Sequence, residues 1–541
     1  MFNQSQKTAV FLLIFAFLGS AFPPAFRAQN QVYKTALTDE LKLDLLIKGG
    51  LVIDGTYRKP VKTDIGIRGD RIVFIGNSAK SKMLAARTLD AAGMIVAPGF
   101  IDPHTHTLED LSNPKLNSNE NYLMQGVTTV ITGNDGGGPV QVAQTLAKWE
   151  QQRIGTNAAL LVGHNTVRRQ IMAMSDSAPT IEQLAEMKNL VGQAMTEGAF
   201  GFSTGLYYAP GSFAKTEEVI ELAKKAAEKG GIYDSHLRDE SSYTIGLLGS
   251  IRETIRIGRE AKIPVNISHI KALGRDVWGQ SPAVIKLIKQ ARAKGIRVTA
   301  DQYPYTASGT GITAALVPRW AEAGGNTALL ERIRDQQVRP RLLAEMETNL
   351  KRRGGAESIL ITGSRNRELV GKTLGALALQ QKKTPVETAL DIVSSGGASI
   401  ASFNMNESDI ENFMKLNFVM TGSDGSSGHP RKYGTFPRKL RQYVFEKKLI
   451  TLPFAIRAAS ALTAESFRIP ERGRIKVGYF ADVIVFNPKT VADRATYEQP
   501  EKFSTGMKYV IVNGKISIDE GKYTKVLAGR ALRKLNSNQQ K

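Results

Sequence analysis

The chain has 541 residues, of which 42% are hydrophobic, and a formal net charge of +22. This length exceeds one ordinary domain but fits one large α/β barrel with an appendage. Cysteine is absent, which excludes disulfides, a cysteine zinc cluster and a lipid-modified N-terminal cysteine. The positive charge favours anionic partners. Because lysines and arginines are interspersed with acids along the chain, we expect no nucleic-acid partner.

The N-terminus has the pattern of a secretory signal. Lys7 precedes the apolar run TAVFLLIFAFLGSAF (8–22), and small residues follow it. We predict a signal peptide over 1–28, cut after Ala21 or Ala28, and export to a bacterial periplasm or out of the cell. The apolar run is short for a membrane span, so we expect no stable membrane insertion after cleavage. An uncleaved N-terminal anchor is the alternative.

Short strands with glycine turns are predicted near both ends of the remaining chain. The segments 45–97 and 466–530 share this pattern of short apolar strands and glycine turns, which indicates that both ends build one small sheet domain. The apolar runs that carry this interpretation are 45–53, 65–75, 481–486 and 509–516.

The middle of the chain, 98–465, alternates between strand and helix patterns. Apolar residues recur at three- and four-residue spacing in 181–197, 216–229 and 282–294, which predicts helices. An alternation of this kind is typical of a parallel α/β fold, whose chemistry lies at the carboxyl ends of the strands. Residues of about 319–400 are richer in helix and charge and are interpreted as an insertion. The expected strands are 126–132, 159–162, 231–234, 265–268, 297–300 and 418–421.

Histidines and one aspartate lie at the ends of these strands. His104 and His106 are two residues apart, so an extended backbone points both imidazoles to the same face. Two converging imidazoles suit a zinc ion. His236, His269 and Asp424 each follow a later strand, in a chain with six histidines. Each alone fits a hydrogen-bonded structural residue, but together they predict a metal site.

Several motifs make the chain resemble the D-aminoacylase (N-acyl-D-amino-acid deacylase) family of the metal-dependent amidohydrolase superfamily. The resemblance runs from about residue 45 to 534. It implies a (β/α)8 TIM-type barrel and a small β-sandwich domain built from both termini. The motifs include PGFIDPHTH (98–106), GVTTVITGNDGG (126–137), YDSHLRDE (233–240), ISHIKALG (267–274), DQYPYTASG (301–309), GSDG (422–425), HPRKYGTFPR (429–438) and RGRIKVGYFADVIVFNP (472–488).

The resemblance implies a metal centre that holds one or two divalent ions, with zinc expected first. In the family, a cysteine and two later histidines hold the tight ion. Here Asp135 stands at the cysteine position, and His236 and His269 match the histidines. His104 and His106 match the ligands of a second metal.

Asp135 leaves two interpretations open. Its carboxylate either binds and bridges the metals, with a shift towards manganese as a further option, or misses the site. A carbamylated bridging lysine is not expected, because 126–135 and 198–207 hold no lysine.

The resemblance also assigns residues to the substrate and to the reaction. Asp424 matches the catalytic aspartate and a metal ligand. Lys271, Tyr303 and Arg431 match the group that holds the substrate's α-carboxylate, with Tyr305 as the second choice for the tyrosine. Such cations suit a small anionic N-acyl amino acid, although ordinary surface cations are the alternative. Arg431 follows Asp424 more closely than in the family.

The predicted reaction is hydrolysis of the amide bond of N-acyl-D-amino acids, with Asp424 as general base. The preference for D over L rests on the resemblance alone. Two rivals stay open: an amidohydrolase acting on a cyclic amide (dihydroorotase- or hydantoinase-like) or a dipeptide, and a non-catalytic secreted scaffold. His164 is interpreted as structural, and Tyr207 and Tyr208 as pocket walls or core residues. The sequence leaves the oligomeric state open.

Overall fold

The computed structural model describes residues 42–534; the predicted signal peptide lies outside this range. Its centre is a ring of eight parallel strands in chain order. The ring closes between the last strand and the first, where the Asp424 amide donates to the His104 carbonyl at 2.9 Å and Thr105 pairs with Gly425. The strands are β8 (Phe100–Thr105), β9 (Val127–Thr132), β10 (Asn157–Gly163), β11 (Gly201–Gly205), β12 (Ile232–His236), β13 (Val265–Ile267), β14 (Val298–Gln302) and β18 (Val419–Thr421).

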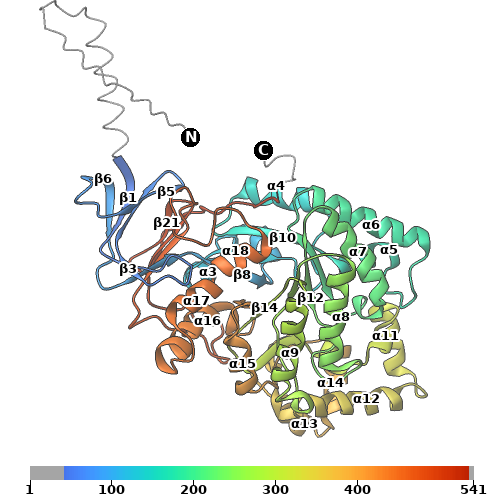
Figure 1. The fold of residues 1–541 in the computed structure, drawn as a ribbon. Helices are drawn as coiled ribbons and strands as arrows, with labels where there is room; N and C mark the ends of the chain where they lie inside the picture. Colours follow the sequence, from blue (N-terminus) through green and yellow to red (C-terminus); the bar gives the residue numbers. More distant parts are fainter. Residues whose placement is uncertain (1–41, 535–541) are drawn as a thin grey trace, which may run out of the picture.

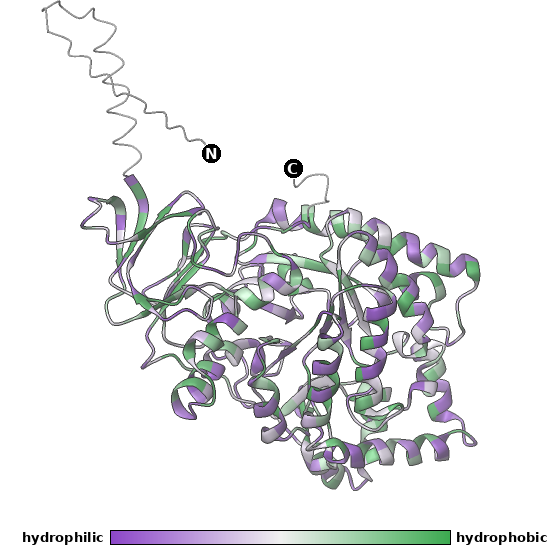
Figure 2. Ribbon diagram, viewed as in Figure 1, coloured by the Kyte–Doolittle hydropathy of each residue, from purple (hydrophilic) through white to green (hydrophobic). Residues whose placement is uncertain are grey.

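Helices surround this ring (Figure 1). In the helix Thr216–Glu228, the buried Val219, Leu222 and Ala223 recur at three- and one-residue steps along one face, so that face packs on the strands. Figure 2 shows the same division, with mainly green to white strands inside and mixed purple and green helices outside. The predicted (β/α)8 barrel is therefore confirmed. The helices are α2 (Leu108–Ser112), α3 (Glu120–Leu123), α4 (Val142–Gln152), α5 (His164–Met172), α6 (Ile181–Thr196), α7 (Thr216–Glu228), α8 (Gly246–Glu260), α9 (Ser281–Ala293), α15 (Glu407–Met414), α16 (Arg431–Arg438), the π-helix Lys439–Glu446, α17 (Leu452–Ala458) and α18 (Ala461–Phe467).

A two-sheet domain lies beside the barrel and is built from segments near both ends of the described chain, and the last described residues, 529–534, return to pair with the barrel. Its larger sheet joins these segments directly, because β19 (Val483–Phe486) pairs antiparallel with β7 (Ile95–Pro98) and places Val485 opposite Val96. One apolar core takes Ile47 and Ile65 from the first segment and Ile511 from the last. In Figure 1 the red β21 accordingly lies among the blue strands. The sheets are β5 (Arg71–Gly76), β4 (Asp64–Arg68), β1 (Lys42–Lys48) and β6 (Leu84–Asp90); and β22 (Lys522–Tyr523), β21 (Lys515–Asp519), β20 (Met507–Val512), β19 (Val483–Phe486), β7 (Ile95–Pro98), β2 (Leu51–Val52) and β3 (Val61–Lys62).

A separate subdomain is inserted between β14 and α15. It has its own antiparallel sheet and its own core, which includes Leu316, Leu342 and Ile400. The sheet begins at Ala307, before the expected start of the insertion near 319, and ends at Phe403. The other expected domain boundaries stay predictions. The elements are β15 (Ala307–Gly311), α10 (Ile312–Leu316), α11 (Gly325–Arg334), α12 (Arg339–Arg352), β16 (Ile359–Gly363), α13 (Leu374–Gln381), α14 (Pro385–Ser394) and β17 (Ser399–Phe403), with strand order β15-β17-β16.

None of the helices within residues 42–534 combines the length and the apolar character needed to cross a membrane.

Candidate metal centre and active site

The predicted metal-binding side chains meet at the carboxyl ends of the barrel strands. His104 lies within β8, and His106 follows that strand by one residue. His236 is the last residue of β12, and His269 and Asp424 follow β13 and β18. Because parallel strands end on the same rim, residues far apart in the chain are brought to one place.

A tight turn after β9 brings Asp135 into this group. Gly133 and Gly136 flank it with φ values of +88° and +74°. A Cβ at Gly133 would lie 2.4 Å from the Leu161 carbonyl oxygen, and one at Gly136 would lie 2.3 Å from Oδ1 of Asn165. Both positions therefore require glycine. The turn allows the carboxylate of Asp135 to point into the barrel mouth.

The carboxylate of Asp135 lies among four histidines. Its Oδ1 is 3.4 Å from Nε2 of His104, 3.5 Å from Nδ1 of His236 and 3.4 Å from Nε2 of His269. Its Oδ2 is 3.5 Å from Nε2 of His106. Of the two interpretations that the sequence left open, this geometry favours the one in which Asp135 points into the site.

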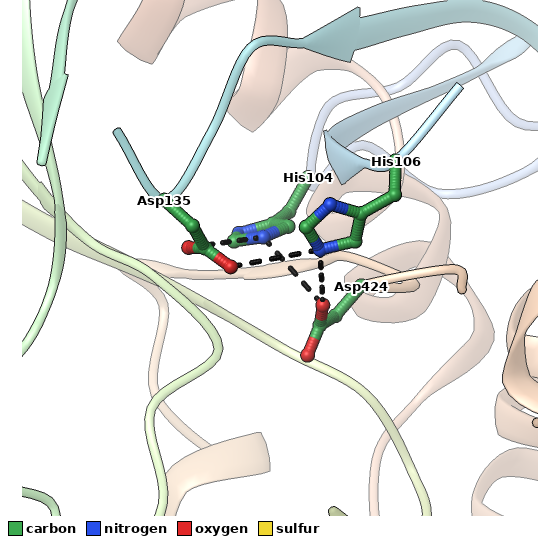
Figure 3. Close-up of side chains that lie close together, drawn as sticks. All are labelled: His104, His106, Asp135 and Asp424. Atoms are coloured by element: carbon green, nitrogen blue, oxygen red, sulfur yellow. Dashed lines mark hydrogen bonds and ion pairs between the residues drawn. The ribbon is translucent and has the colours of Figure 1, made fainter. Parts of the chain in front are cut away.

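Asp424, from near the other end of the chain, faces two of these histidines, His104 and His106 (Figure 3). Its Oδ1 lies 3.0 Å from Nε2 of His106 and 3.6 Å from Nε2 of His104. The donors form two groups, His104–His106–Asp135–Asp424 and Asp135–His236–His269, and in each group the ligand atoms lie within 4.8 Å of one another. Asp135 belongs to both groups, which is the arrangement that a bridging carboxylate requires.

The distances of 3.4–3.5 Å between the Asp135 oxygens and the histidine nitrogens suit ligands of a common metal ion better than direct hydrogen bonds. Two ligands about 2.1 Å from a tetrahedral zinc ion lie about 3.4 Å apart. Nε2 of His104, Oδ1 of Asp135 and both ring nitrogens of His236 are buried, and none has a hydrogen-bond partner within residues 42–534. Buried polar atoms are rarely left unpaired. The donor set therefore fits one or two divalent metal ions.

Three of the site residues have a left-handed backbone, which is uncommon outside glycine. The φ values are +55° for Asp135, +34° for His269 and +47° for Asp424. Such conformations cost about 1–3 kcal/mol each and cluster at functional sites. The surrounding turns therefore hold these side chains in place at the expense of local stability.

The electrostatics of the group favour a positive charge at its centre. Burial by itself would lower the pKa of His104, but Asp135, Asp424 and Asp301 outweigh it and raise this pKa to about 10. Burial would raise the pKa of Asp424, yet Arg431 and the nearby histidines hold it well below its usual range. The carboxylates of Asp135 and Asp424 are thus ionised at neutral pH. A divalent cation bound between them would balance their negative charge, as the proton on His104 otherwise does.

Glu240 connects the two histidines of one donor group and was assigned no role from the sequence. Its Oε1 lies 3.1 Å from Nδ1 of His269 and 2.6 Å from Nζ of Lys271, and its Oε2 lies 3.8 Å from Nε2 of His236. Burial would raise the pKa of Glu240, but Lys271 and the two histidines keep it far below its usual value. An ionised partner behind a ligating imidazole fixes its tautomer and increases its basicity.

We expect Glu240→Gln to lower zinc affinity by about 10–100-fold, the usual cost of losing such a supporting carboxylate. Competition with a chromophoric chelator measures this affinity. Glu253→Gln is a comparison variant, because Glu253 is half-buried and also paired, to Arg238, but touches none of the predicted ligands. Unchanged zinc affinity in Glu240→Gln would show that Glu240 does not support the metal site.

A buried polar layer supports the histidines from below. Asn266 donates to Asp234 at 2.8 Å and to Asp301 at 2.7 Å, and Asp301 accepts from the His269 amide at 3.0 Å. Burial raises the pKa of Asp234 to about 6. Asp234 precedes His236 by two residues on β12, so the two-residue alternation of strands was a signal that both point inward.

The predicted carboxylate-binding residues line one cavity of about 390 Å³ together with the predicted metal ligands other than His104. Nη1 of Arg431 lies 2.8 Å from Oδ2 of Asp424, and its guanidinium lies 4.7 Å from the centre of the Tyr303 ring. Lys271 lies 5.8 Å from the same ring. Tyr305 instead places its hydroxyl 3.4 Å from the Pro430 carbonyl oxygen. The structure brings Lys271, Tyr303 and Arg431 together, and their contact with substrate stays a prediction.

The remaining candidates divide into structural and cavity-lining residues. His164 is fully buried and lies 2.8 Å from Glu218 through Nε2, away from the cavity. Tyr207 and Tyr208 line the cavity, with ring centres 5.7 and 4.7 Å from that of His236. They therefore form part of the wall beside one metal-binding histidine.

Comparisons with known proteins show which proteins this chain is similar to. The model of the amidohydrolase family matches residues 87–518. The chain is 34% identical to a D-aminoacylase of Alcaligenes xylosoxydans xylosoxydans over 533 residues, which cover 92% of this chain and 98% of the relative. A solved D-aminoacylase structure with a binuclear metal centre superimposes with a TM-score of 0.78 at 33% identity, covering 91% of this chain and all of the other.

A further solved structure shows zinc in a similar protein. The N-acyl-D-glutamate deacylase of Bordetella bronchiseptica, in complex with zinc and a phosphonate inhibitor, gives a TM-score of 0.77 at 32% identity, with 91% of this chain and all of the other covered. Together with the two donor groups, these relatives confirm the expected cofactor of one or two divalent metal ions, zinc first. The chain belongs to the amidohydrolase family and, within it, to the metal-dependent D-aminoacylase group.

Proposed function

We propose that this enzyme hydrolyses the amide bond of N-acyl-D-amino acids to a carboxylate and a D-amino acid. The observation that carries the proposal is the cavity that Asp424, four further predicted metal ligands and the cations Lys271 and Arg431 line together. The D-aminoacylase and the N-acyl-D-glutamate deacylase that resemble this chain support the same substrate class.

The reaction needs a water nucleophile, a polarised carbonyl and a proton carrier. A divalent cation held by the histidines and Asp135 supplies Lewis acidity and lowers the pKa of water. Asp424 accepts a proton from the attacking water and returns it to the leaving nitrogen. Its pKa lies well below the usual range because Arg431 and the nearby histidines outweigh its burial, so it starts as a carboxylate. Nε of Arg431 has no hydrogen-bond partner within the described residues. Its N–H can therefore donate a hydrogen bond to the substrate carboxylate.

The direct test is a screen of N-acyl-D- and N-acyl-L-amino acids, with metal analysis on the same sample. We expect hydrolysis of the D-series by metal-loaded enzyme. Metal-loaded protein that hydrolyses neither series, or the L-series in preference, would contradict the proposal. Hydrolysis of a cyclic amide or a dipeptide instead would favour the corresponding rival reaction, and a metal-free, inert protein would favour a scaffold.

The predicted α-carboxylate contacts lead to a second test. Lys271→Ala and Arg431→Ala are expected to raise KM for N-acyl-D-amino acids about tenfold or more each, because each removes a charge-assisted hydrogen bond. The matching N-acyl-D-amino acid amide lacks the carboxylate, so its KM is expected to rise much less in both variants. Steady-state kinetics on both substrates measure this difference. Equal losses for acid and amide would rule out the carboxylate contact.

We also propose that the enzyme acts outside the cytoplasm, in a bacterial periplasm or beyond it. The apolar run at 8–22 and the absence of cysteine support this location. N-terminal sequencing of the protein recovered from cell fractions tests it. Mature protein that still begins at Met1 and stays in the cytoplasmic fraction would rule it out.

A further inference from the structure

One buried cation in the cavity has no part in the proposed reaction. Arg353 follows α12 in the inserted subdomain, is 2% exposed, and lines the same cavity as the metal ligands. Its Nη1 is buried without a hydrogen-bond partner within residues 42–534. A buried guanidinium is costly unless a counter-charge pairs with it.

The contacts of Arg353 are all to neutral groups. Nε donates to the Tyr243 hydroxyl at 2.9 Å and to the Ala315 carbonyl at 3.3 Å, and Nη2 donates to the Tyr207 hydroxyl at 3.0 Å. The Tyr207 hydroxyl donates in turn to the Ala314 carbonyl at 2.7 Å, so it faces Arg353 as a hydroxyl group. Burial raises the pKa of Tyr243, which keeps it neutral as well. Neither tyrosine provides a negative charge.

The acids that line the cavity already have partners. Glu240 pairs with Lys271, Asp424 pairs with Arg431, and Asp135 lies among histidines. Among the described residues, Arg353 forms no ion pair with a carboxylate. Arg353 is therefore left without a counter-charge in a cavity that it lines together with Lys271 and Arg431.

The position of Arg353 relates it to the reacting centre. The Tyr207 ring stacks on that of His236, with centres 5.7 Å apart and planes at 25°. Arg353 is thus separated from a predicted metal ligand by one tyrosine ring. Arg431 lies instead beside Asp424, so the cavity holds two separate places for anionic groups.

We propose that Arg353 binds a second carboxylate of the substrate, so that the enzyme prefers N-acyl-D-amino acids with an additional carboxylate on the side chain or on the acyl group. This inference rests on the proposed function and extends it. The insertion then selects the substrate, while the barrel rim carries the reaction. A carboxylate fits the guanidinium fork through charge-assisted hydrogen bonds.

Two pairs of substrates distinguish the two sources of the carboxylate. N-acetyl-D-glutamate is compared with N-acetyl-D-glutamine for the side chain, and N-succinyl-D-alanine with N-butanoyl-D-alanine for the acyl group. In the wild-type enzyme, we expect kcat/KM for the acid to exceed that for its neutral counterpart by about tenfold or more in one pair. Arg353→Gln should bring that ratio close to one, and Arg353→Lys should retain part of it.

The adjacent Arg352 provides a matched control. It lies on the same turn but lines a neighbouring cavity, where its Nη1 donates to Asn349 at 2.7 Å. Arg352→Gln is expected to keep the acid-to-neutral ratio of the wild type. Wild-type enzyme without preference in either pair would overturn the inference, as would an Arg353→Gln enzyme that retains the preference. If Arg353→Gln lowered kcat/KM equally for acidic and neutral substrates, Arg353 would only join the insertion to the barrel, and the inference would be overturned.

Calorimetric binding separates a failure of this inference from a failure of the proposed function. In an Asp424→Asn background that is loaded with zinc, the affinities for N-acetyl-D-glutamate and N-acetyl-D-glutamine are compared with and without Arg353→Gln, and the succinyl and butanoyl pair is treated in the same way. Selective binding of an acid that depends on Arg353, without any hydrolysis by the wild type, would retain the inference and reject the proposed function. Hydrolysis of N-acyl-D-amino acids without any preference for the acidic substrates would retain the proposed function and reject the inference about Arg353.

Discussion

Asp424→Asn is expected to reduce kcat by about 10²–10⁴-fold, the usual contribution of a general acid–base group, while the metal content is retained. The amide cannot accept the proton of the attacking water at neutral pH. The histidines and Asp135 still provide the other donors of both groups. Kinetics and metal analysis on the same sample measure the two quantities.

Asparagine is the suitable replacement because Asp424 has φ +47°. Asparagine tolerates the left-handed region, whereas alanine would add backbone strain. Asp391→Asn is the matched control, since Asp391 lies on α14 and pairs with Lys383 at the surface. It should leave kcat unchanged. Normal turnover by a metal-loaded Asp424→Asn enzyme would exclude Asp424 as the proton carrier.

Asp135→Asn is expected to lower the metal content per chain and to weaken zinc binding by at least tenfold, which corresponds to about 1.4 kcal/mol. Asp135 belongs to both donor groups, so losing its charge affects both ions. The neutral amide oxygen is a poorer ligand than a carboxylate, and asparagine tolerates the φ of +55° at this position.

Metal analysis after dialysis against defined free zinc measures this effect, and thermal unfolding with and without added zinc provides a second readout. Because ligand binding stabilises the folded state, zinc should raise the Tm of Asp135→Asn less than that of the wild type. Asp391→Asn again serves as the control. Wild-type metal content in Asp135→Asn would mean that the carboxylate lies near the ions without holding them.

The strand and helix patterns along the chain were sufficient to predict a parallel α/β fold and a metal site at its strand ends, and the family resemblance added the (β/α)8 barrel and the assignment of each ligand. His104 and His106 lie two apart at a strand end, and that spacing sets their common direction. His236 and His269 each follow a predicted strand, and parallel strands end on the same rim. Local spacing and the regular geometry of the fold thus decide where these side chains point.

Asp135 and Glu240 required the tertiary structure. Asp135 could point into the site or miss it, because its direction depends on a left-handed turn between Gly133 and Gly136 that must fit against β10 and β11. Glu240 lies in a loop after β12 and reaches both His269 and Lys271 from the next strand. Contacts of this kind arise when neighbouring loops pack together.

The sequence by itself determined the fold class, the type of metal ligand and their common rim, because strand period and chain order encode them locally. Only the tertiary structure decided that Asp135 belongs to both donor groups and that Arg353 from the insertion donates a hydrogen bond to Tyr207 of the barrel. Arg353 and Tyr207 are 146 residues apart. Their contact depends on how a separately packed subdomain docks on the barrel mouth, and no local pattern in either segment specifies that docking.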